Sequence, residues 1–189
     1  MLSYAEKKFL LILARRSLEK YLKEKERLEI DEESLPSEVL KEKRGVFVTL
    51  WKNKELRGCV GDLEGNGEIY QSVIDNSLAS GLLDNRFLPL TINELAEIEI
   101  EISILSPLKK LLSANKEDLL GYLGKKRPGL FVKKNNFQAT FLPQVWAEIE
   151  RPEMFLSELC RKAGLEENEW EKMDLEIYEY EAEVFKEKD

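Results

Sequence analysis

The order of apolar and polar residues along the chain predicts helices at its start and near its middle. Apolar residues recur at helical spacing from the N-terminus to about residue 28. Ser3 and Glu6 form a capping box, a pattern typical of the first turn of a helix. Residues 68–83 repeat the helical spacing, so a second helix is predicted there.

Other segments alternate between apolar and polar residues, which favours strands. "GVFVTLWK" and "ELRGCVGDL" flank Asn53-Lys54, so residues 45–63 are predicted to form a hairpin. In residues 96–106, isoleucine alternates with glutamate or serine, as in a strand with one buried and one wet face. A second hairpin is predicted over residues 129–143, turning at Asn135-Asn136.

The C-terminal third predicts shorter elements. Short helices are expected near residues 115–122, from Pro143 through Glu150, and from Pro152 to about Gly164. Residues 174–185 predict a strand whose apolar phase shifts at Ile177-Tyr178, which suggests a bulge or burial on both faces. Together the elements predict an α+β fold with a mostly antiparallel sheet and packed helices.

Length and composition favour one globular domain, or one domain with a small appended lobe. The chain has 189 residues, of which 43% are hydrophobic and 35% charged. Its longest apolar run, residues 9–14, is far shorter than the roughly 20 residues that span a bilayer. The first residues enter an amphipathic pattern directly, without the features of a cleavable leader, so we predict a cytoplasmic protein.

The chain contains no histidine, which excludes several kinds of site. Neither a Cys-His nor a Ser-His nucleophile pair can form, and no imidazole can bind a metal. The two cysteines, Cys59 and Cys160, have no disulfide or zinc spacing. Acid–base chemistry would need carboxylates, lysines, tyrosines, a thiol or water. The scattered carboxylates form no recognisable ligand set, so no metal site is predicted, and no cofactor can be named.

The charge is unevenly distributed along the chain. The net charge is −8, yet residues 105–135 hold eight basic and two acidic residues. Such a segment could meet an anionic partner, but a solvated loop and hairpin surface is the preferred interpretation, because a chain that is acidic overall is a poor non-specific binder of nucleic acid.

Cys59 is the first candidate for chemistry. Strand alternation places Arg57, Cys59 and Gly61 on one face, and a nearby cation favours the reactive thiolate. The neighbouring glycines Gly58 and Gly61 would let a ligand or another segment approach the backbone closely. The alternative is structural: a small buried thiol beside a crossing helix. Cys160, on an apolar helical face, is predicted to be a core residue.

A second candidate cluster lies in "LLDNRFLPL", where Asp84 and Arg86 occupy an irregular segment between apolar anchors. A local ion pair or helix cap is the structural alternative. Gln144, at a predicted strand–helix junction, could orient a ligand or satisfy buried backbone groups.

Four blocks of the sequence resemble the AMMECR domain family, the domain of the AMME-syndrome candidate protein. The resemblance is collinear from about residue 4 to residue 180. The block "LRGCVG" is the hallmark of that family. The blocks are "FVTLWKNKELRGCVGDL", "ASGLLDNRFLPLTINELAEIEIEISILSP", "FQATFLPQVW" and "FLSELCRKAGL".

The resemblance implies an α+β fold with a larger and a smaller lobe and a cleft lined by the hallmark block. It also implies an association with a Memo-like protein and a radical S-adenosylmethionine enzyme. The chain departs from the family where a Gly-x-His-Gly-Leu stretch is common, because Arg127 and Pro128 stand there. The matching blocks carry the candidate site residues Arg57, Gly58, Cys59, Gly61, Asp84, Arg86, Gln144, Arg161 and Lys162.

Two hypotheses follow for function. In the first, the protein is an enzyme or enzyme accessory with Cys59 as nucleophile or presented thiol. Arg57 and Arg86 would hold an anionic group, and Asp84 would orient Arg86 or move a proton. In the second, the protein is a non-catalytic binding module or scaffold for a protein, nucleotide or RNA.

Overall fold

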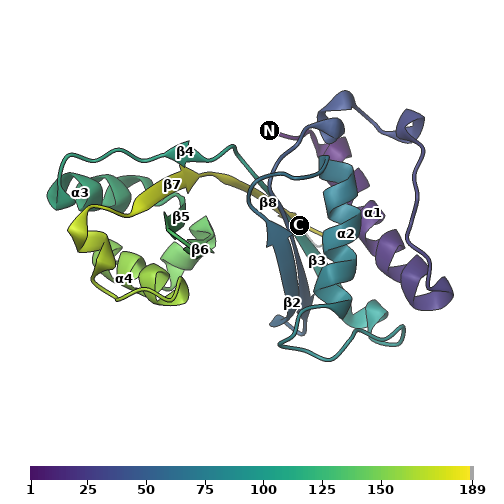
Figure 1. The fold of residues 1–189 in the computed structure, drawn as a ribbon. Helices are drawn as coiled ribbons and strands as arrows, with labels where there is room; N and C mark the ends of the chain where they lie inside the picture. Colours follow the sequence, from purple (N-terminus) through teal and green to yellow (C-terminus); the bar gives the residue numbers. More distant parts are fainter. Residues whose placement is uncertain (188–189) are drawn as a thin grey trace. The chain divides into compact units, whose positions relative to one another are not determined.

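The computed structural model describes residues 1–187, which divide into two compact units. Unit 1 comprises Met1–Leu105 and the C-terminal segment from Glu183, and unit 2 comprises Ser106–Ala182. Each unit has its own sheet, its own helices and its own hydrophobic core (Figure 1). This organisation is an α+β fold with largely antiparallel sheets, as the sequence predicts.

Unit 1 contains a four-stranded sheet in the order β2-β1-β3-β8, with β1 antiparallel to both β2 and β3. Helices α1 and α2 pack against each other and against the sheet (Figure 1). The elements are α1 (Tyr4–Glu24), β1 (Val46–Lys52), β2 (Glu55–Asp62), α2 (Ile69–Leu82), β3 (Ile98–Leu105) and β8 (Ala182–Lys186), with short 3-10 turns at Glu32–Ser34, Glu38–Lys41 and Leu95–Glu97.

The alternating pattern of the sequence determines which face of this sheet is buried. Val46, Val48 and Leu50 of β1 are fully buried and pair with the isoleucines of β3. The glutamates of β3 lie on the opposite face of the same strand. The apolar face therefore belongs to the core of unit 1.

Unit 2 contains a second antiparallel sheet, in the order β4-β7-β5-β6. Its core includes Trp146 stacked on Phe155, with ring centroids 3.8 Å apart. The elements are β4 (Lys109–Lys110), α3 (Lys116–Lys126), β5 (Gly129–Lys134), β6 (Phe137–Phe141), a 3-10 turn (Pro143–Ala147), α4 (Pro152–Lys162), a second 3-10 turn (Glu169–Lys172) and β7 (Glu176–Tyr180).

Three predicted elements differ from the structure. Helix α1 ends at Glu24, because Lys25 adopts a left-handed conformation as its C-cap. The segment from Pro143 forms a 3-10 turn that ends at Ala147. The predicted last strand divides at Glu181 into β7 and β8, which belong to different sheets. The apolar phase shift at Ile177-Tyr178 lies inside β7, which pairs with β5 in a regular register, so the bulge offered as one explanation was wrong. The other explanation, burial on both faces, agrees with the structure, because Ile177 lies in the core of unit 2 and half-buried Tyr178 packs on Phe131.

No helix among residues 1–187 is long and apolar enough to cross a membrane. In the same range, no three histidine, cysteine, aspartate or glutamate side chains gather as a metal-binding group.

Candidate functional site

Strand β2, which carries Cys59, is the edge strand of the unit 1 sheet. Asn53 and Lys54, both with positive φ, form the tight turn that joins it to β1. The pairing puts Leu50 opposite Gly58 but Trp51 opposite Leu56, which leaves Arg57 as the extra residue of a β-bulge. The bulge interrupts the regular alternation from which the sequence placed Arg57 on the face of Cys59.

The two glycines of the hallmark block permit close packing. A Cβ on Gly58 would lie 2.1 Å from the carbonyl oxygen of Ser80, so α2 packs directly on the β2 backbone. A Cβ on Gly61 would lie 2.4 Å from the ring of Phe47. The sequence predicted close approach at these positions, and here the approaching groups belong to unit 1 itself.

The backbone and thiol of Cys59 are held by polar side chains. The Cys59 N–H donates to Oδ2 of Asp84 at 2.9 Å, and Nη2 of Arg86 donates to the Cys59 carbonyl at 3.4 Å. The hydroxyl of Thr49, opposite on β1, donates to the Cys59 sulfur at 3.3 Å. We call Asp84 and Arg86 the edge clamp, because they satisfy backbone groups of the edge strand.

The edge clamp is itself a strong ion pair. Arg86 donates from Nε to Oδ1 of Asp84 at 2.9 Å and from Nη2 to Oδ2 at 2.6 Å. The Arg86 hydrogen bond, together with the Cys59 N–H, holds the pKa of the Asp84 carboxyl well below its usual range. The pKa of Arg86 is raised, chiefly by Asp84, with a smaller electrostatic contribution from Cys59. The local ion pair considered from the sequence is therefore present.

Arg57 has different partners from those the sequence suggested. Its guanidinium donates to both carboxylate oxygens of Glu94, at 3.2 and 3.3 Å, and to the Leu88 carbonyl at 2.9 Å. The Arg57 hydrogen bonds lower the pKa of Glu94 to about 2. The ring of Phe87 lies near both guanidiniums, with its centroid 5.8 Å from Arg57 and 5.5 Å from Arg86. Arg57 thus fixes the segment after α2.

The remaining candidate residues lie in unit 2. Gln144 is exposed in the 3-10 turn that follows β6. Arg161 forms an ion pair with Glu158 on the surface of α4 and another with Glu167, which follows the helix. Lys162 donates to the Thr140 carbonyl of β6 at 3.0 Å. The structure therefore brings together Cys59, Asp84 and Arg86 within unit 1, and places the other three residues in unit 2.

Cys160 is buried completely in the core of unit 2, as the sequence predicted. Burial raises the pKa of its thiol. Cys59 is half-buried and lies on a strand at the edge of a sheet.

Sequence reasoning missed three residues of this region: Thr49, Ser80 and Glu94. Ser80 accepts the Val60 N–H at 2.9 Å and donates to the Val48 carbonyl at 2.7 Å, so it links α2 to both strands of the hairpin. A two-residue turn without a bulge would have placed Thr49 opposite Gly58. The bulge at Arg57 moves Thr49 opposite Cys59, and the sequence carries no clear signal for that shift.

The basic segment is partly neutralised within unit 2. Lys110 pairs with Glu176, Lys116 with Glu171, and Lys134 with Glu169 and Asp174. Lys109 lies 3.7 Å from Glu179. In the folded protein, the positive charge of residues 105–135 is therefore partly balanced by acidic side chains that lie outside this segment.

The fold and this region define a two-unit α+β protein in which an edge-strand cysteine is held by an aspartate–arginine clamp. The AMMECR1 family model matches residues 11–185, and the chain belongs to this family.

Two archaeal proteins resemble the chain over nearly its whole length. Protein MK0488 of Methanopyrus kandleri is 38% identical over 196 residues, covering 100% of this chain and 91% of that protein. Protein MJ0810 of Methanocaldococcus jannaschii is 35% identical, covering 99% and 92%.

A solved structure extends the likeness to three dimensions. The crystal structure of the uncharacterized protein PH0010 from Pyrococcus horikoshii matches with a TM-score of 0.90 at 33% identity. The match covers 99% of this chain and 94% of that chain. The relatives share the fold and leave the activity open.

Proposed function

We propose that this AMMECR1 family protein acts through the Cys59 thiol, as an enzyme or as the accessory of one. In this proposal, Cys59 is the nucleophile, or the thiol presented to the product of a partner enzyme. The main support for this proposal is the set of hydrogen bonds to Cys59: Asp84 and Arg86 hold its backbone, and Thr49 donates to its sulfur. Nucleophilic chemistry requires a sulfur that is held in position and that a substrate can reach, and Cys59 is held by these contacts while only half-buried.

The contacts divide the roles of the charged residues. Arg86 is the candidate for holding an anionic group, because its side chain is 52% exposed beside Cys59. The Arg57 side chain is 13% exposed and bound to Glu94, so it positions the segment that carries Arg86. Asp84 orients Arg86, since its lowered pKa keeps it ionised and makes it a poor proton carrier at neutral pH.

The test is the rate at which iodoacetamide alkylates the native protein, read by mass spectrometry of labelled peptides. Cys160 is the internal control, because it is fully buried in the unit 2 core. We expect rapid labelling of Cys59 at neutral pH and labelling of Cys160 on unfolding alone. Slow labelling of Cys59, in step with unfolding as for Cys160, would contradict the proposal and make the hallmark strand purely architectural.

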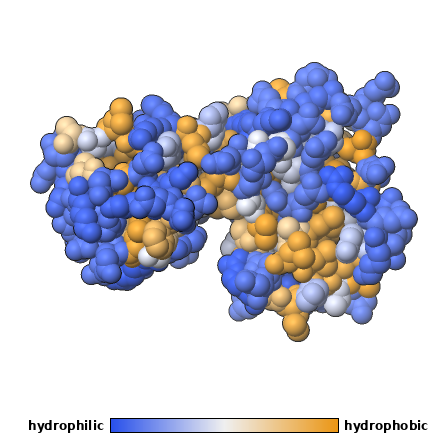
Figure 2. Space-filling view, viewed as in Figure 1, coloured by the Kyte–Doolittle hydropathy of each residue, from blue (hydrophilic) through white to orange (hydrophobic). Residues whose placement is uncertain are grey.

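A second candidate function is a scaffold that binds a protein partner, and exposed leucines favour it. Leu83 and Leu88 flank the edge clamp and are 77% and 83% exposed, and Ile92 follows them at the surface. Apolar side chains gather on unit 1 over the lower part of α2 (Figure 2). Hydrogen bonds from Arg57 to Leu88 and within the clamp hold this segment in place, and rigid apolar side chains suit protein recognition.

The resemblance of the sequence suggests which partners to try first: a Memo-like protein and a radical S-adenosylmethionine enzyme. A Leu83→Ser/Leu88→Ser double variant should weaken such a complex about tenfold or more in a calorimetric titration. Exposed Leu112 in unit 2 supplies the matched control, Leu112→Ser. Equal affinity of the wild-type protein and the double variant would exclude this surface as the docking site.

A further inference from the structure

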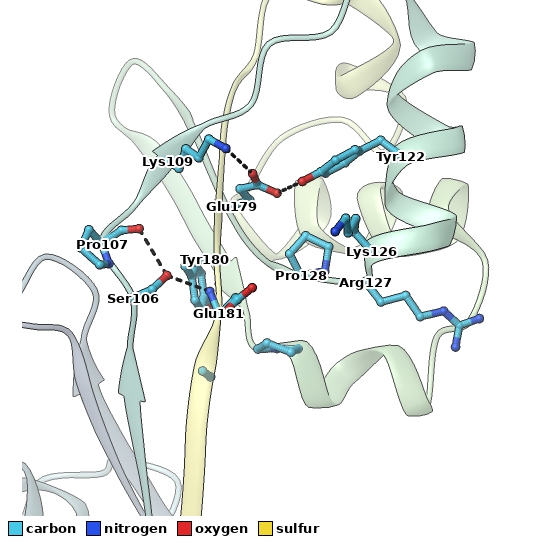
Figure 3. Close-up of a pocket in the computed structure, with 12 residues that line it drawn as sticks. Ser106, Pro107, Lys109, Tyr122, Lys126, Arg127, Pro128, Glu179, Tyr180 and Glu181 are labelled. Atoms are coloured by element: carbon cyan, nitrogen blue, oxygen red, sulfur yellow. Dashed lines mark hydrogen bonds and ion pairs between the residues drawn. The ribbon is translucent and has the colours of Figure 1, made fainter. Parts of the chain in front are cut away.

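A cavity of about 570 Å³ lies within unit 2 (Figure 3). Its wall comes from Ser106 and Pro107, from Lys109 of β4, from the end of α3 and the residues after it, from Pro143, and from residues 179–182. Sites that hold small organic ligands usually enclose about 300–1,000 Å³. The cavity is therefore large enough for a metabolite-sized molecule.

One wall of the cavity is apolar and firmly held. The buried ring of Tyr180 packs over Gly129, where a Cβ would lie 2.4 Å from the ring. The Tyr180 hydroxyl lies 2.6 Å from Oγ1 of Thr140. The carbonyl of Pro128 accepts the Trp146 indole N–H at 2.7 Å. This wall is formed before any ligand arrives, which lowers the entropic cost of binding.

The carboxylates around the cavity differ in their surroundings. Glu179 accepts the Tyr122 hydroxyl at 2.5 Å and lies 3.7 Å from Nζ of Lys109, so its charge is largely balanced (Figure 3). The side chain of Glu181 is exposed, while its backbone N–H binds the Ser106 hydroxyl at 3.0 Å. Glu181 is therefore available to accept hydrogen bonds from a ligand.

Two cationic side chains at the end of α3 line the cavity. Lys126 and Arg127 are exposed, and among residues 1–187 neither pairs with a carboxylate. They differ in this from Lys110, Lys116 and Lys134 of the same basic segment. Arg127 has a φ of 50°, a left-handed conformation that favours glycine or asparagine. Figure 3 shows Lys126 beside Pro128, and Arg127 extending outward from the edge.

The geometry points to a binding site for a phosphate monoester with a hydroxylated organic body, such as a sugar phosphate or a nucleoside monophosphate. The phosphate dianion binds Lys126 at the edge of the cavity, and the Arg127 side chain, which extends outward in Figure 3, turns towards it to supply the second positive charge. The organic part of the ligand lies against Pro107 and Pro143, the accessible prolines beside the buried Tyr180 ring, and its hydroxyl groups donate to Glu181. All of these residues belong to unit 2, so the inference is independent of the role of Cys59.

Isothermal titration calorimetry on the full chain tests the site with four probes: ribose 5-phosphate, adenosine 5′-monophosphate, adenosine and inorganic phosphate. Binding of either organic phosphate, with adenosine and inorganic phosphate each at least about tenfold weaker, is the expected result. Comparison of the first two probes distinguishes a sugar phosphate site from a nucleotide site.

Three variants locate the binding. Lys126→Ala and Arg127→Gly should each weaken the organic phosphate about tenfold, and glycine suits the backbone conformation at position 127. Lys125→Ala is the matched control, because Lys125 is an exposed neighbour that does not line the cavity. The Lys125→Ala variant should bind the organic phosphate with the affinity of the wild-type protein. Thermal melting verifies that each variant is folded.

Two outcomes would overturn the inference. The first is the absence of binding by either organic phosphate at millimolar concentrations. The second is an equal loss of affinity in Lys125→Ala and Lys126→Ala, which would reveal general attraction to a basic surface.

Discussion

The two cysteines of this protein occupy opposite kinds of environment. Cys160 lies in the core of unit 2, among apolar side chains of α4 and the aromatic ring of Trp170. Cys59 lies on an edge strand of unit 1, where Thr49, Asp84 and Arg86 contact it through hydrogen bonds. Apolar packing holds the first cysteine, and directional polar contacts hold the second.

The difference teaches how an edge strand can be protected without another strand. The carboxylate of Asp84 accepts the Cys59 N–H and the guanidinium of Arg86 donates to the Cys59 carbonyl, as a neighbouring backbone would. This arrangement leaves the thiol half-buried rather than covered. Changes at the clamp and changes at the core should therefore have different consequences for stability and for thiol access.

The largest effect is expected at the contact between α2 and β2. Gly58→Ala should lower the free energy of unfolding by about 3 kcal/mol or more, because the new methyl group would meet the Ser80 backbone at 2.1 Å. Urea denaturation measures the change. Gly121→Ala is the control, since Gly121 is an exposed position of helix α3 where a Cβ would have no neighbour within 4 Å. This variant should be neutral or slightly stabilising. Equal stability of both variants would refute the close contact.

Loss of the clamp should come next. Asp84→Ala removes the acceptor of the Cys59 N–H and of Arg86, and should cost about 2–3 kcal/mol. The same variant should speed alkylation of Cys59 while Cys160 stays protected, because the edge opens locally. If both thiols became equally accessible, the clamp would be a determinant of global stability and not of the edge.

Serine substitution compares the two cysteines directly. Cys160→Ser should cost about 1–3 kcal/mol, because the hydroxyl is buried in an apolar core. Cys59→Ser should cost less than about 1 kcal/mol, because Thr49 can donate to a hydroxyl as it does to the sulfur. Thermal melting of both variants gives the order, and a larger loss at Cys59 would reverse the comparison.

The ion pair of Arg57 with Glu94 should make stability depend on acid pH. The pKa of Glu94 is lowered in the folded state to about 2, from its ordinary value of 4.5, so ionised Glu94 stabilises the protein. That contribution is fully present above about pH 5 and is lost as the pH falls towards 2. Glu94→Gln should therefore melt below the wild type at neutral pH, and the two melting temperatures should converge on acidification. If the difference between the two melting temperatures stayed constant with pH, the ion pair of Arg57 with Glu94 would not be the source of the stabilisation.

Local pattern was sufficient for most of the fold. The Asn53-Lys54 and Asn135-Asn136 turns, the alternating strand after residue 97 and the capping box at Ser3 were all readable from neighbouring residues. Such features depend on backbone preference and on which side of an element is apolar. The burial of Cys160 followed from the same helical spacing.

The sequence by itself determined the element types, the absence of histidine chemistry and the blocks that mark the family. Tertiary structure decided the partners of the other charged side chains: Arg57 with Glu94, and the lysines of the basic segment with acidic residues of unit 2. The Asp84–Arg86 ion pair joins near neighbours and was already one of the interpretations of the sequence. It also decided that residues 174–185 serve two sheets. The reason is physical: backbone preference acts between neighbours, whereas ion pairs and strand pairing join residues that only the folded chain brings together.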